Sequence, residues 1–294
     1  MKVIKWLEKK TGSLEGKTVA ITGSTGGIGR ELCRYLLSLG ASLVLVDRDR
    51  KRSDELRLVL KKEFCDAHIE QIISDMENMD SVKESCLILE SMEIYALVLN
   101  AGAYSIPRHK CSTGYDNVFQ INFISPYYMA RRLMPYLEAV VAVGSIAHNY
   151  SKTDPDDVDF SNRKKASLVY GNAKRYLMYA LHGLFESEEK ACLAVTHPGI
   201  SFTGITNHYP KLIFAIIKNP MKVIFMKPKT ACLSILYGLF EKTEKGTWIG
   251  PRIFDIWGKP KKKALKTASV SEQQYIFEEA ERIYKELEKG NDRS

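Results

Sequence analysis

Residues 17–29 read KTVAITGSTGGIG, an apolar stretch followed by a turn rich in glycine. The apolar residues up to Ile21 predict a buried strand, and a helix is expected to begin near Gly27. Glycine at position 23 can adopt backbone angles closed to other residues, and Gly27 and Gly29 allow close approach of a ligand and of the helix. The N-terminus of such a helix directs its free N–H groups at a bound phosphate. The pattern predicts a dinucleotide-binding strand, turn and helix rather than a plain turn.

The rest of the chain alternates short apolar runs with amphipathic segments of helical length. This alternation is typical of βαβ units, so we expect an α/β fold with a single doubly wound, Rossmann-type domain and a mainly parallel, seven-stranded sheet. Strands are expected at residues 18–21, 42–46, 69–73, 96–99, 140–143, 192–196 and 247–249. Helices are expected at residues 27–39, 53–64, 79–91, 114–137, 166–185 and 229–240.

Two segments interrupt this regular pattern, although residues 1–294 are expected to form one domain. Residues 200–228 contain an apolar run flanked by lysines, and we interpret them as a lid over the substrate that also contacts an anionic membrane surface. A buried helix with lysines at its rim is the alternative. Residues 259–294 are expected to form a charged helical tail.

The composition is that of an ordinary folded protein with a basic surface. Apolar residues make up 45% of the 294 positions and charged residues 27%, with a net charge of +8. Such a charge suits nucleic acid, an anionic membrane or an anionic cofactor. The basic residues are mostly dispersed, with clusters only at 211–229 and 259–266, and no nucleic-acid-binding motif accompanies them. We therefore expect no nucleic-acid partner.

The cysteines and the N-terminus indicate a cytoplasmic protein. The six cysteines form no CxxC pair and show no metal-ligand spacing, which favours reduced thiols and no bound metal. The N-terminus lacks the apolar stretch of a signal peptide, and no run is long enough to span a bilayer. Contact with the periphery of a membrane and assembly into a homo-oligomer are left open by the sequence.

Four residues later in the chain suggest acid–base chemistry. Tyr170 and Lys174 lie four positions apart in an expected helix and so share one face, although this spacing is common by chance. Ser145 follows the fifth expected strand, at the sheet edge where doubly wound folds bind ligands. Asn122 is a polar residue on a mostly apolar helix, which needs either a structural hydrogen-bond partner or a function.

In order and context these residues resemble the short-chain dehydrogenase/reductase family. The turn at residues 22–29 has its TGxxxGxG spacing, and Asn122, Ser145, Tyr170 and Lys174 resemble its catalytic tetrad. The resemblance implies an NAD(P)-dependent oxidoreductase that interconverts a primary or secondary alcohol and its carbonyl by hydride transfer. Tyr170 would be the general acid/base, Lys174 would favour its phenolate and hold the ribose, and Ser145 would hydrogen-bond the reacting oxygen. Asn122 would order a helix break and a proton-relay water.

The resemblance also implies a set of cofactor-binding residues. An NAG motif follows the fourth strand, Asp75 would lie beside the adenine unless it only caps a helix, and a PG motif follows the sixth strand. The implied residues are Gly23, Ser24, Thr25, Gly27, Ile28, Gly29, Asp47, Arg48, Asp75, Met76, Asn100, Ala101, Gly102, Tyr170, Lys174, Pro198, Gly199 and Thr203.

Two adjacent residues bear on the choice between NAD and NADP. Asp47 closes the second expected strand, where its carboxylate can accept hydrogen bonds from the adenosine ribose and repel a 2′-phosphate. An arginine in the position of Arg48 often holds that phosphate in the family. A turn-capping Asp47 with a solvated Arg48 is the alternative to both roles. We expect NAD to be favoured over NADP because Asp47 is nearer to the ribose.

The interval of 25 residues between Ser145 and Tyr170 is about twice the common family spacing. It is similar to the longer loop of the retinol dehydrogenase-like branch, whose SxAH sequence resembles residues 145–148. This similarity implies a bulky apolar substrate, such as a lipid, retinoid or steroid, whereas surface decoration is the alternative. A non-catalytic protein that senses NAD(P) remains the competing function, although such a protein gains nothing from a complete tetrad.

Overall fold

The structure is a computed structural model that describes residues 9–186, 188, 190–199, 226–241, 243–244 and 246–289. Its sheet has the strand order β3-β2-β1-β4-β5-β6-β7-β8, and every neighbouring pair is parallel except β7 and β8. The expected doubly wound α/β fold with a mainly parallel sheet is confirmed. The strands are β1 (Thr18–Thr22), β2 (Ser42–Asp47), β3 (Ile69–Ile73), β4 (Ala96–Leu99), β5 (Ala139–Val143), β6 (Cys192–Thr196), β7 (Thr247–Ile253) and β8 (Trp257–Ala264).

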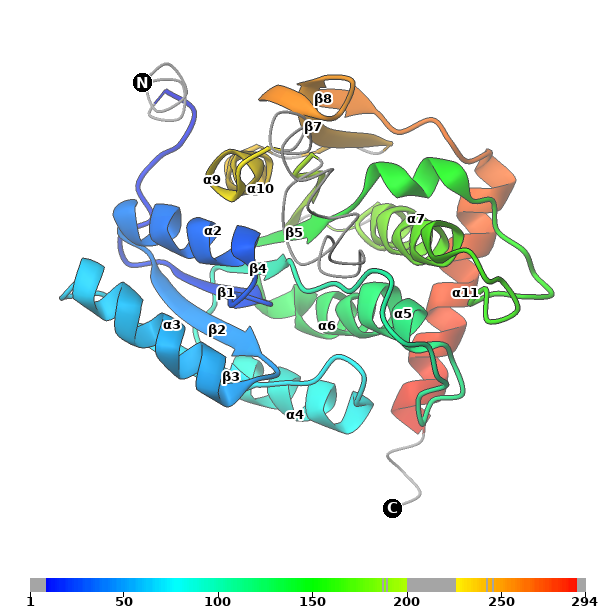
Figure 1. Ribbon diagram of the computed structural model, residues 1–294, viewed down its shortest axis with the longest axis horizontal. Helices are drawn as coiled ribbons and strands as arrows, with labels where there is room; N and C mark the ends of the chain where they lie inside the picture. The colour runs from blue at the N-terminus through cyan, green and yellow to red at the C-terminus, as the bar shows by residue number, and fades with distance from the viewer. Residues whose placement is uncertain are drawn as a thin grey trace, which may run out of the picture.

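Helices cover both faces of the sheet (Figure 1). One face packs against α2 (Gly27–Ser38), α3 (Arg50–Glu63) and α10 (Leu233–Gly238), which follows the short α9 (Pro228–Ala231). The other face packs against α4 (Met79–Glu90), α6 (Ser125–Leu133), α7 (Ala166–Leu184) and α11 (Val270–Lys289). None of the helices in the described ranges is long and apolar enough to cross a membrane.

The central strands are apolar on both faces because each face is covered. In β1, Val19 and Ile21 contribute to one core and Ala20 to the other, as the alternation of side chains along a strand requires. The chain runs outward from β1 to β3 and then returns to place β4 on the other side of β1. This reversal of strand order creates the crevice at the carboxyl ends of β1 and β4 where doubly wound folds bind ligands.

The helix expected at residues 114–137 is broken into several parts. A short α5 (Asn117–Phe119) leads into a π-helical turn at Gln120–Ile124, then α6, then a 3-10 turn at Met134–Tyr136. Within the π turn, the N–H of Ser125 bonds to the carbonyl of Gln120, five residues earlier. Pro126 explains the break, because it has no N–H to donate to the carbonyl of Asn122 as a continuous α-helix requires. The π turn contains Asn122, one of the candidate catalytic residues.

The C-terminal tail differs from the helical extension that the sequence predicts. It begins as β8, an eighth strand that pairs antiparallel with β7, and only then forms α11. The charges at residues 259–264 led to the helical expectation, but lysines are also well suited to an exposed edge strand. Helix α11 then packs against α7, the helix that carries Tyr170 and Lys174 (Figure 1).

A buried ion pair fixes α11 to α7. The guanidinium of Arg175 donates to both carboxylate oxygens of Glu272, at 2.8 and 2.6 Å. It also donates to the carbonyls of Thr267, at 2.6 Å, and His148, at 3.1 Å. Glu272 in turn accepts hydrogen bonds from the backbone N–H and hydroxyl of Thr153, each at 3.0 Å. One carboxylate therefore joins the C-terminal helix, the catalytic helix and the loop that follows Ser145.

We predict that Glu272→Gln destabilises the protein by about 2 kcal/mol at neutral pH, because it leaves the buried Arg175 without a counter-ion. Burial raises the pKa of Glu272, but hydrogen bonds from Arg175 and Thr153 outweigh it and hold this pKa below its ordinary value of 4.5. A carboxylate with a lowered folded-state pKa stabilises the fold above its unfolded pKa and loses that contribution in acid.

The difference in free energy of unfolding between wild type and Glu272→Gln should therefore be constant from pH 6 to 8, and shrink as the pH falls below about 4.5. Urea denaturation at several pH values measures it. Glu278→Gln, an exposed change on the same helix, is the control. A difference independent of pH would contradict the assignment of the ion pair.

Candidate active site

The glycine-rich turn is held against the loop after β4. Gly23 has a φ of +67°, and a Cβ atom there would lie 2.9 Å from the Cα of Ala101. At Gly29 a Cβ atom would lie 2.6 Å from the carbonyl oxygen of Gly23. The side chain of Asn100 donates to the carbonyls of Thr22, at 3.0 Å, and Gly23, at 2.9 Å. These contacts explain why the turn needs glycine and how Asn100 fixes its shape.

Helix α2 begins beside this turn with its N–H groups free of any side-chain cap. The N-cap position is Gly26, which has no side chain to accept from the first turn of the helix. The predicted residues Gly27 and Ile28 start the helix, so their N–H groups belong to the set that lacks an intrahelical acceptor. An anionic group can satisfy these donors, which is how helix N-termini bind phosphate.

Asp47 binds the same turn from the end of β2. Its buried carboxylate accepts from the hydroxyls of Ser24, at 2.5 Å, and Ser53, at 3.1 Å, and from the N–H and hydroxyl of Thr25, at 3.1 and 3.2 Å. Four donors from the turn and from α3 meet this carboxylate, so Asp47 holds the turn in place. Ser53 could not be recognised from sequence, because it lies on α3 and no motif marks it.

Arg48 extends outward from the neighbouring position. Its side chain is 68% exposed, and the nearest acidic partner is Glu77, with 3.9 Å between Nη1 and Oε1. Glu77 follows two other predicted cofactor residues. Asp75 accepts from the N–H of Glu77 at 3.0 Å, and the carbonyl of Met76 accepts from the hydroxyl of Ser125 at 2.7 Å. The loop after β3 is thus tied to the π-helical segment.

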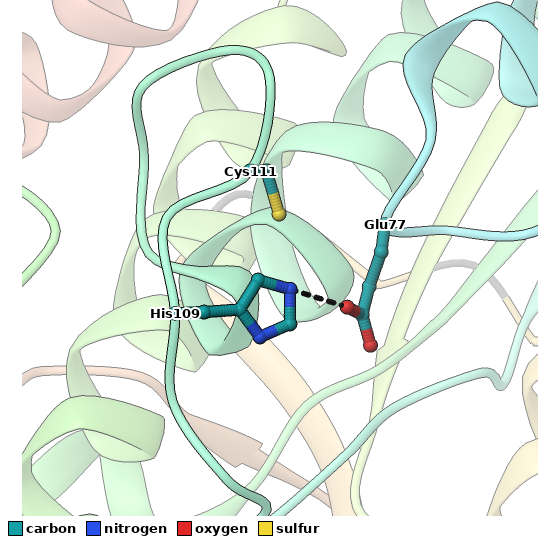
Figure 2. A group of neighbouring side chains, drawn as sticks. All are labelled: Glu77, His109 and Cys111. Atoms are coloured by element: carbon teal, nitrogen blue, oxygen red, sulfur yellow. Dashed lines mark ion pairs between the residues drawn. The ribbon is translucent and has the colours of Figure 1, made fainter.

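Glu77 is also part of a cluster with His109 and Cys111, in which side chains from two loops point toward one another (Figure 2). The His109 Nε2 lies 3.0 Å from Glu77 Oε2. The amide nitrogen of Asn117 lies 3.2 Å from His109 Nδ1 and donates to the carbonyl of Pro107. Since that nitrogen only donates, Nδ1 accepts and Nε2 carries the proton toward Glu77. The cluster therefore joins the two loops by hydrogen bonds.

Asn122 is buried in the π turn and contacts the loop after β4. Its side-chain oxygen accepts from the N–H of Ala103 at 3.2 Å, and its nitrogen donates to the carbonyls of Ala103 and Val118, both at 2.8 Å. A Cβ atom at Gly102 would lie 2.8 Å from the Asn122 oxygen and 3.6 Å from Lys174 Nζ. Gly102 thus leaves room beside two of the candidate catalytic side chains.

Lys174 is a buried ammonium group with few partners. Its side chain donates to the carbonyl of Val143 at 2.8 Å and lies over the ring of Tyr170, with 5.9 Å from Nζ to the centroid. Burial lowers the pKa of Lys174 from 10.5 to about 7. Among the described residues no carboxylate pairs with Lys174, and a pKa lowered in this way by burial is typical of functional positions.

Tyr170 lies deep in the site although part of its surface remains accessible. Burial raises the pKa of its phenol to about 12, a hydrogen bond with the Ser145 hydroxyl lowers it, and nearby Tyr104 raises it. The Tyr104 ring packs edge-on against it, with 5.3 Å between centroids. Ser145 also accepts from the N–H of Ala147 at 3.2 Å. The structure therefore brings Asn122, Ser145, Tyr170 and Lys174 to one edge of the sheet.

Comparison with known proteins agrees with this geometry. A sequence model of the short-chain dehydrogenases matches residues 17–153. Dehydrogenase/reductase SDR family member FEY of Arabidopsis thaliana is 26% identical over 93% of this chain and 78% of its own. Retinol dehydrogenase 14 of Mus musculus is 28% identical over 67% of this chain and 65% of its own. These matches support a relationship of the chain to the short-chain dehydrogenase/reductase family.

The chain also shares its fold with solved structures. A protein from Mycobacterium paratuberculosis superposes with a TM-score of 0.75 at 19% identity, over 94% of this chain and 96% of the other. RhlG of Pseudomonas aeruginosa, solved with NADP, superposes with a TM-score of 0.59 at 21% identity, over 78% of this chain and 91% of the other. At these identities the likeness shows the fold alone.

The predicted residues after β6 are placed only in part. Pro198 and Gly199 follow β6, and Gly199 has a φ of +81°. Next to it lies the β7–β8 turn, because a Cβ atom at Gly199 would be 2.8 Å from the carbonyl of Ile256. Thr203 and most of the expected lid at 200–228 lie outside the described residues.

Two residues that position the four candidate catalytic side chains were not identified from the sequence. A Cβ atom at Gly171 would lie 2.4 Å from the carbonyl oxygen of Ala147, so only glycine lets α7 approach the segment after Ser145. Arg175, next to Lys174, anchors α7 through Glu272. The YxxxK spacing gave no signal for the glycine, and the partner of Arg175 is 97 residues away.

The loop between Ser145 and Tyr170 packs against the helix that carries Tyr170. It begins with a 3-10 turn, Ile146–Tyr150, in which His148 is buried. The hydroxyl of Ser151 donates to the carbonyl of Leu168 at 2.8 Å, and the side chain of Asn172 donates to the carbonyl of Val158 at 2.7 Å. The loop is therefore attached to the catalytic helix on both sides of Tyr170.

We predict that Lys174→Met stabilises the cofactor-free protein by about 1–3 kcal/mol at pH 6, because it removes the cost of burying a charge, offset in part by the lost bond to Val143. Since the folded-state pKa is about 7 and the ordinary value is 10.5, the full penalty applies below pH 7 and is relieved as the pH rises toward 10.5.

The stabilisation should accordingly shrink between pH 7 and 10. Urea denaturation of wild type and variant at both ends of that range measures it, with the exposed Lys164→Met as the control. A stabilisation that grows with pH would refute the assigned pKa.

Proposed function

We propose that this short-chain dehydrogenase uses a nicotinamide cofactor, NAD in preference to NADP, to interconvert a bulky apolar alcohol and its carbonyl. Tyr170 is the general acid/base. The observation that carries the proposal is the convergence of a buried, uncompensated Lys174 with Tyr170, Ser145 and Asn122 beside the glycine-rich turn. A protein that only senses a cofactor has no need of this arrangement.

The residues present fit a dinucleotide. The α2 N-terminus has free donors for the pyrophosphate, and Gly23 and Gly102 keep side chains out of the path of the ligand. Ser24 and Thr25 line the same turn, and Ala101 borders it from the loop after β4. When bound, the nicotinamide supplies the hydride acceptor for alcohol oxidation or the hydride donor for carbonyl reduction.

The proton is handled by Tyr170. In alcohol oxidation its phenolate accepts the proton of the substrate hydroxyl, and in the reverse direction its phenol returns a proton to the carbonyl oxygen. The positive charge of Lys174 and the hydroxyl of Ser145 favour the phenolate against the cost of burial. Ser145 also stabilises the charge that develops on the reacting oxygen. Asn122 holds the π turn that shapes this side of the site.

The preference for NAD rests on two carboxylates. Asp47 places a buried negative charge where the adenosine ribose would bind, and Glu77 lies close enough to Arg48 to draw it away from a 2′-phosphate. The apolar substrate is supported by relatives such as retinol dehydrogenase 14, whose name specifies a lipid-like alcohol.

Replacing Tyr170 by Phe should lower kcat by about 10²–10⁴-fold with any accepted alcohol, because the proton acceptor is lost. Affinity for NADH, measured by the change in its fluorescence, should stay within about twofold because the pyrophosphate site is untouched. A screen of retinoid, steroid and long-chain alcohols by absorbance at the NADH band identifies the substrate. Full turnover by the variant would exclude the mechanism.

The cofactor preference should reverse when the charge at position 47 is removed. We expect wild type to have the higher kcat/KM with NAD, and Asp47→Ala to lower the ratio of the NAD to the NADP value by about tenfold or more, since repulsion of the 2′-phosphate is lost. Asp47→Asn removes the charge but keeps one of the two acceptor oxygens, so comparing it with Asp47→Ala separates the effect of charge from part of the effect on the turn. A wild type that prefers NADP would show that Arg48 controls this pocket.

A further inference from the structure

The turn between β7 and β8 carries an exposed apolar tip. Ile253, Phe254 and Trp257 are 49%, 79% and 36% exposed. Other large apolar residues on the described surface are exposed singly or in pairs on helices and loops, which is usual for folded proteins. Three such side chains within five positions at a projecting turn suggest a binding surface.

The backbone of this turn holds Phe254 outward in a conformation unusual for its residue type. Phe254 and Asp255 have φ values of +50° and +57°, and the N–H of Ile256 bonds to the carbonyl of Ile253 at 3.0 Å. Positive φ at both central residues is typical of tight hairpin turns, which usually carry Asn-Gly there. A large aromatic residue with a positive φ is under backbone strain, which is typical of functional positions.

A lysine stabilises the turn from behind. Lys263 Nζ donates to the Asp255 carboxylate and to the carbonyl of Pro251, both at 2.6 Å. This bond uses the only acidic residue between positions 252 and 266. The tip is therefore a rigid projection, and its acidic group is already neutralised.

Positive charge surrounds the tip. Four exposed cations, Arg252, Lys259, Lys261 and Lys266, have no carboxylate partner within the described part of the chain. Lysines on an edge strand also prevent strand pairing between molecules, which alone would explain those of β8. That role does not explain an exposed Phe254 in a left-handed turn. Aromatic side chains flanked by lysines are instead the composition of segments that bind the interface of anionic membranes.

We propose that the β7–β8 turn docks the protein on an anionic lipid bilayer, with Ile253, Phe254 and Trp257 inserted at headgroup level and the flanking cations on lipid headgroups. The tip is adjacent to Gly199, as its contacts with Ile256 and Pro251 show, so it lies at the same sheet edge as Tyr170. Docking would turn this edge toward the lipid. On the proposed function, the apolar alcohol would then enter from the bilayer.

The test is flotation of the full chain with vesicles of phosphatidylcholine alone or with about 30% phosphatidylserine. Wild type should bind the anionic vesicles only, and about 500 mM salt should weaken binding by screening the headgroup contacts. Phe254→Asn is the informative variant, because asparagine tolerates a positive φ and the fold should be at least as stable. It should reduce the partition coefficient by about tenfold or more. Leu58→Ser, at an apolar residue of α3 that is 59% exposed, should leave the partition coefficient unaltered.

Insertion is checked separately by tryptophan fluorescence. With anionic vesicles, the emission of wild type should shift to shorter wavelength as Trp257 enters the bilayer. The same shift should be absent from Trp257→Phe. Equal binding by wild type and Phe254→Asn, or equal binding to both kinds of vesicle, would overturn the proposal. So would stronger binding to duplex DNA than to vesicles at the same salt concentration. These measurements need no turnover, so their outcome is independent of whether Tyr170 catalyses alcohol oxidation.

Discussion

The buried ammonium group of Lys174 is the constraint around which the candidate site is organised. A charge without a carboxylate partner is costly in the protein interior, and within the described residues the Val143 carbonyl and the face of the Tyr170 ring contribute to its stabilisation. The surrounding structure has to hold the Lys174 ammonium group in place despite this cost. Asn122 in the π turn and Gly102, which has no side chain, lie beside it, and Gly171 lets its helix approach the segment after Ser145.

Around this charge the structure divides into a part that binds phosphate and ribose and a part that handles the proton. The first consists of β1, β2 and β4 with the turn held by Asp47 and Asn100. The second consists of β5, α7 and the loop after Ser145. The Asn122 side chain joins them, because it lies in the helical segment between the two and bonds to the backbone after β4.

The sequence predicted the fold well because strand–helix alternation and the glycine-rich turn are local patterns. It failed where a single residue overrides a longer pattern, as Pro126 does in the expected helix at 114–137. It also failed where lysines suggested an exposed helix at residues 259–264 and formed an edge strand instead. In the site, the motifs identified Tyr170, Lys174, Ser145 and Asn122. The donors to Asp47 and the Arg175–Glu272 pair are tertiary contacts that no local spacing encodes.

The ion pair between Arg175 and Glu272 also sets the order in which the two halves of the protein can fold during synthesis. Chains are made at roughly 5–20 residues per second, so the 97 residues between these partners take roughly 5–20 s to synthesise. During that interval the nascent chain holds all the residues of the dinucleotide half, whereas α7 carries a guanidinium that has no counter-ion to be buried with. The half that binds phosphate can therefore form first, and the half that handles the proton closes only after the C-terminal helix has been made.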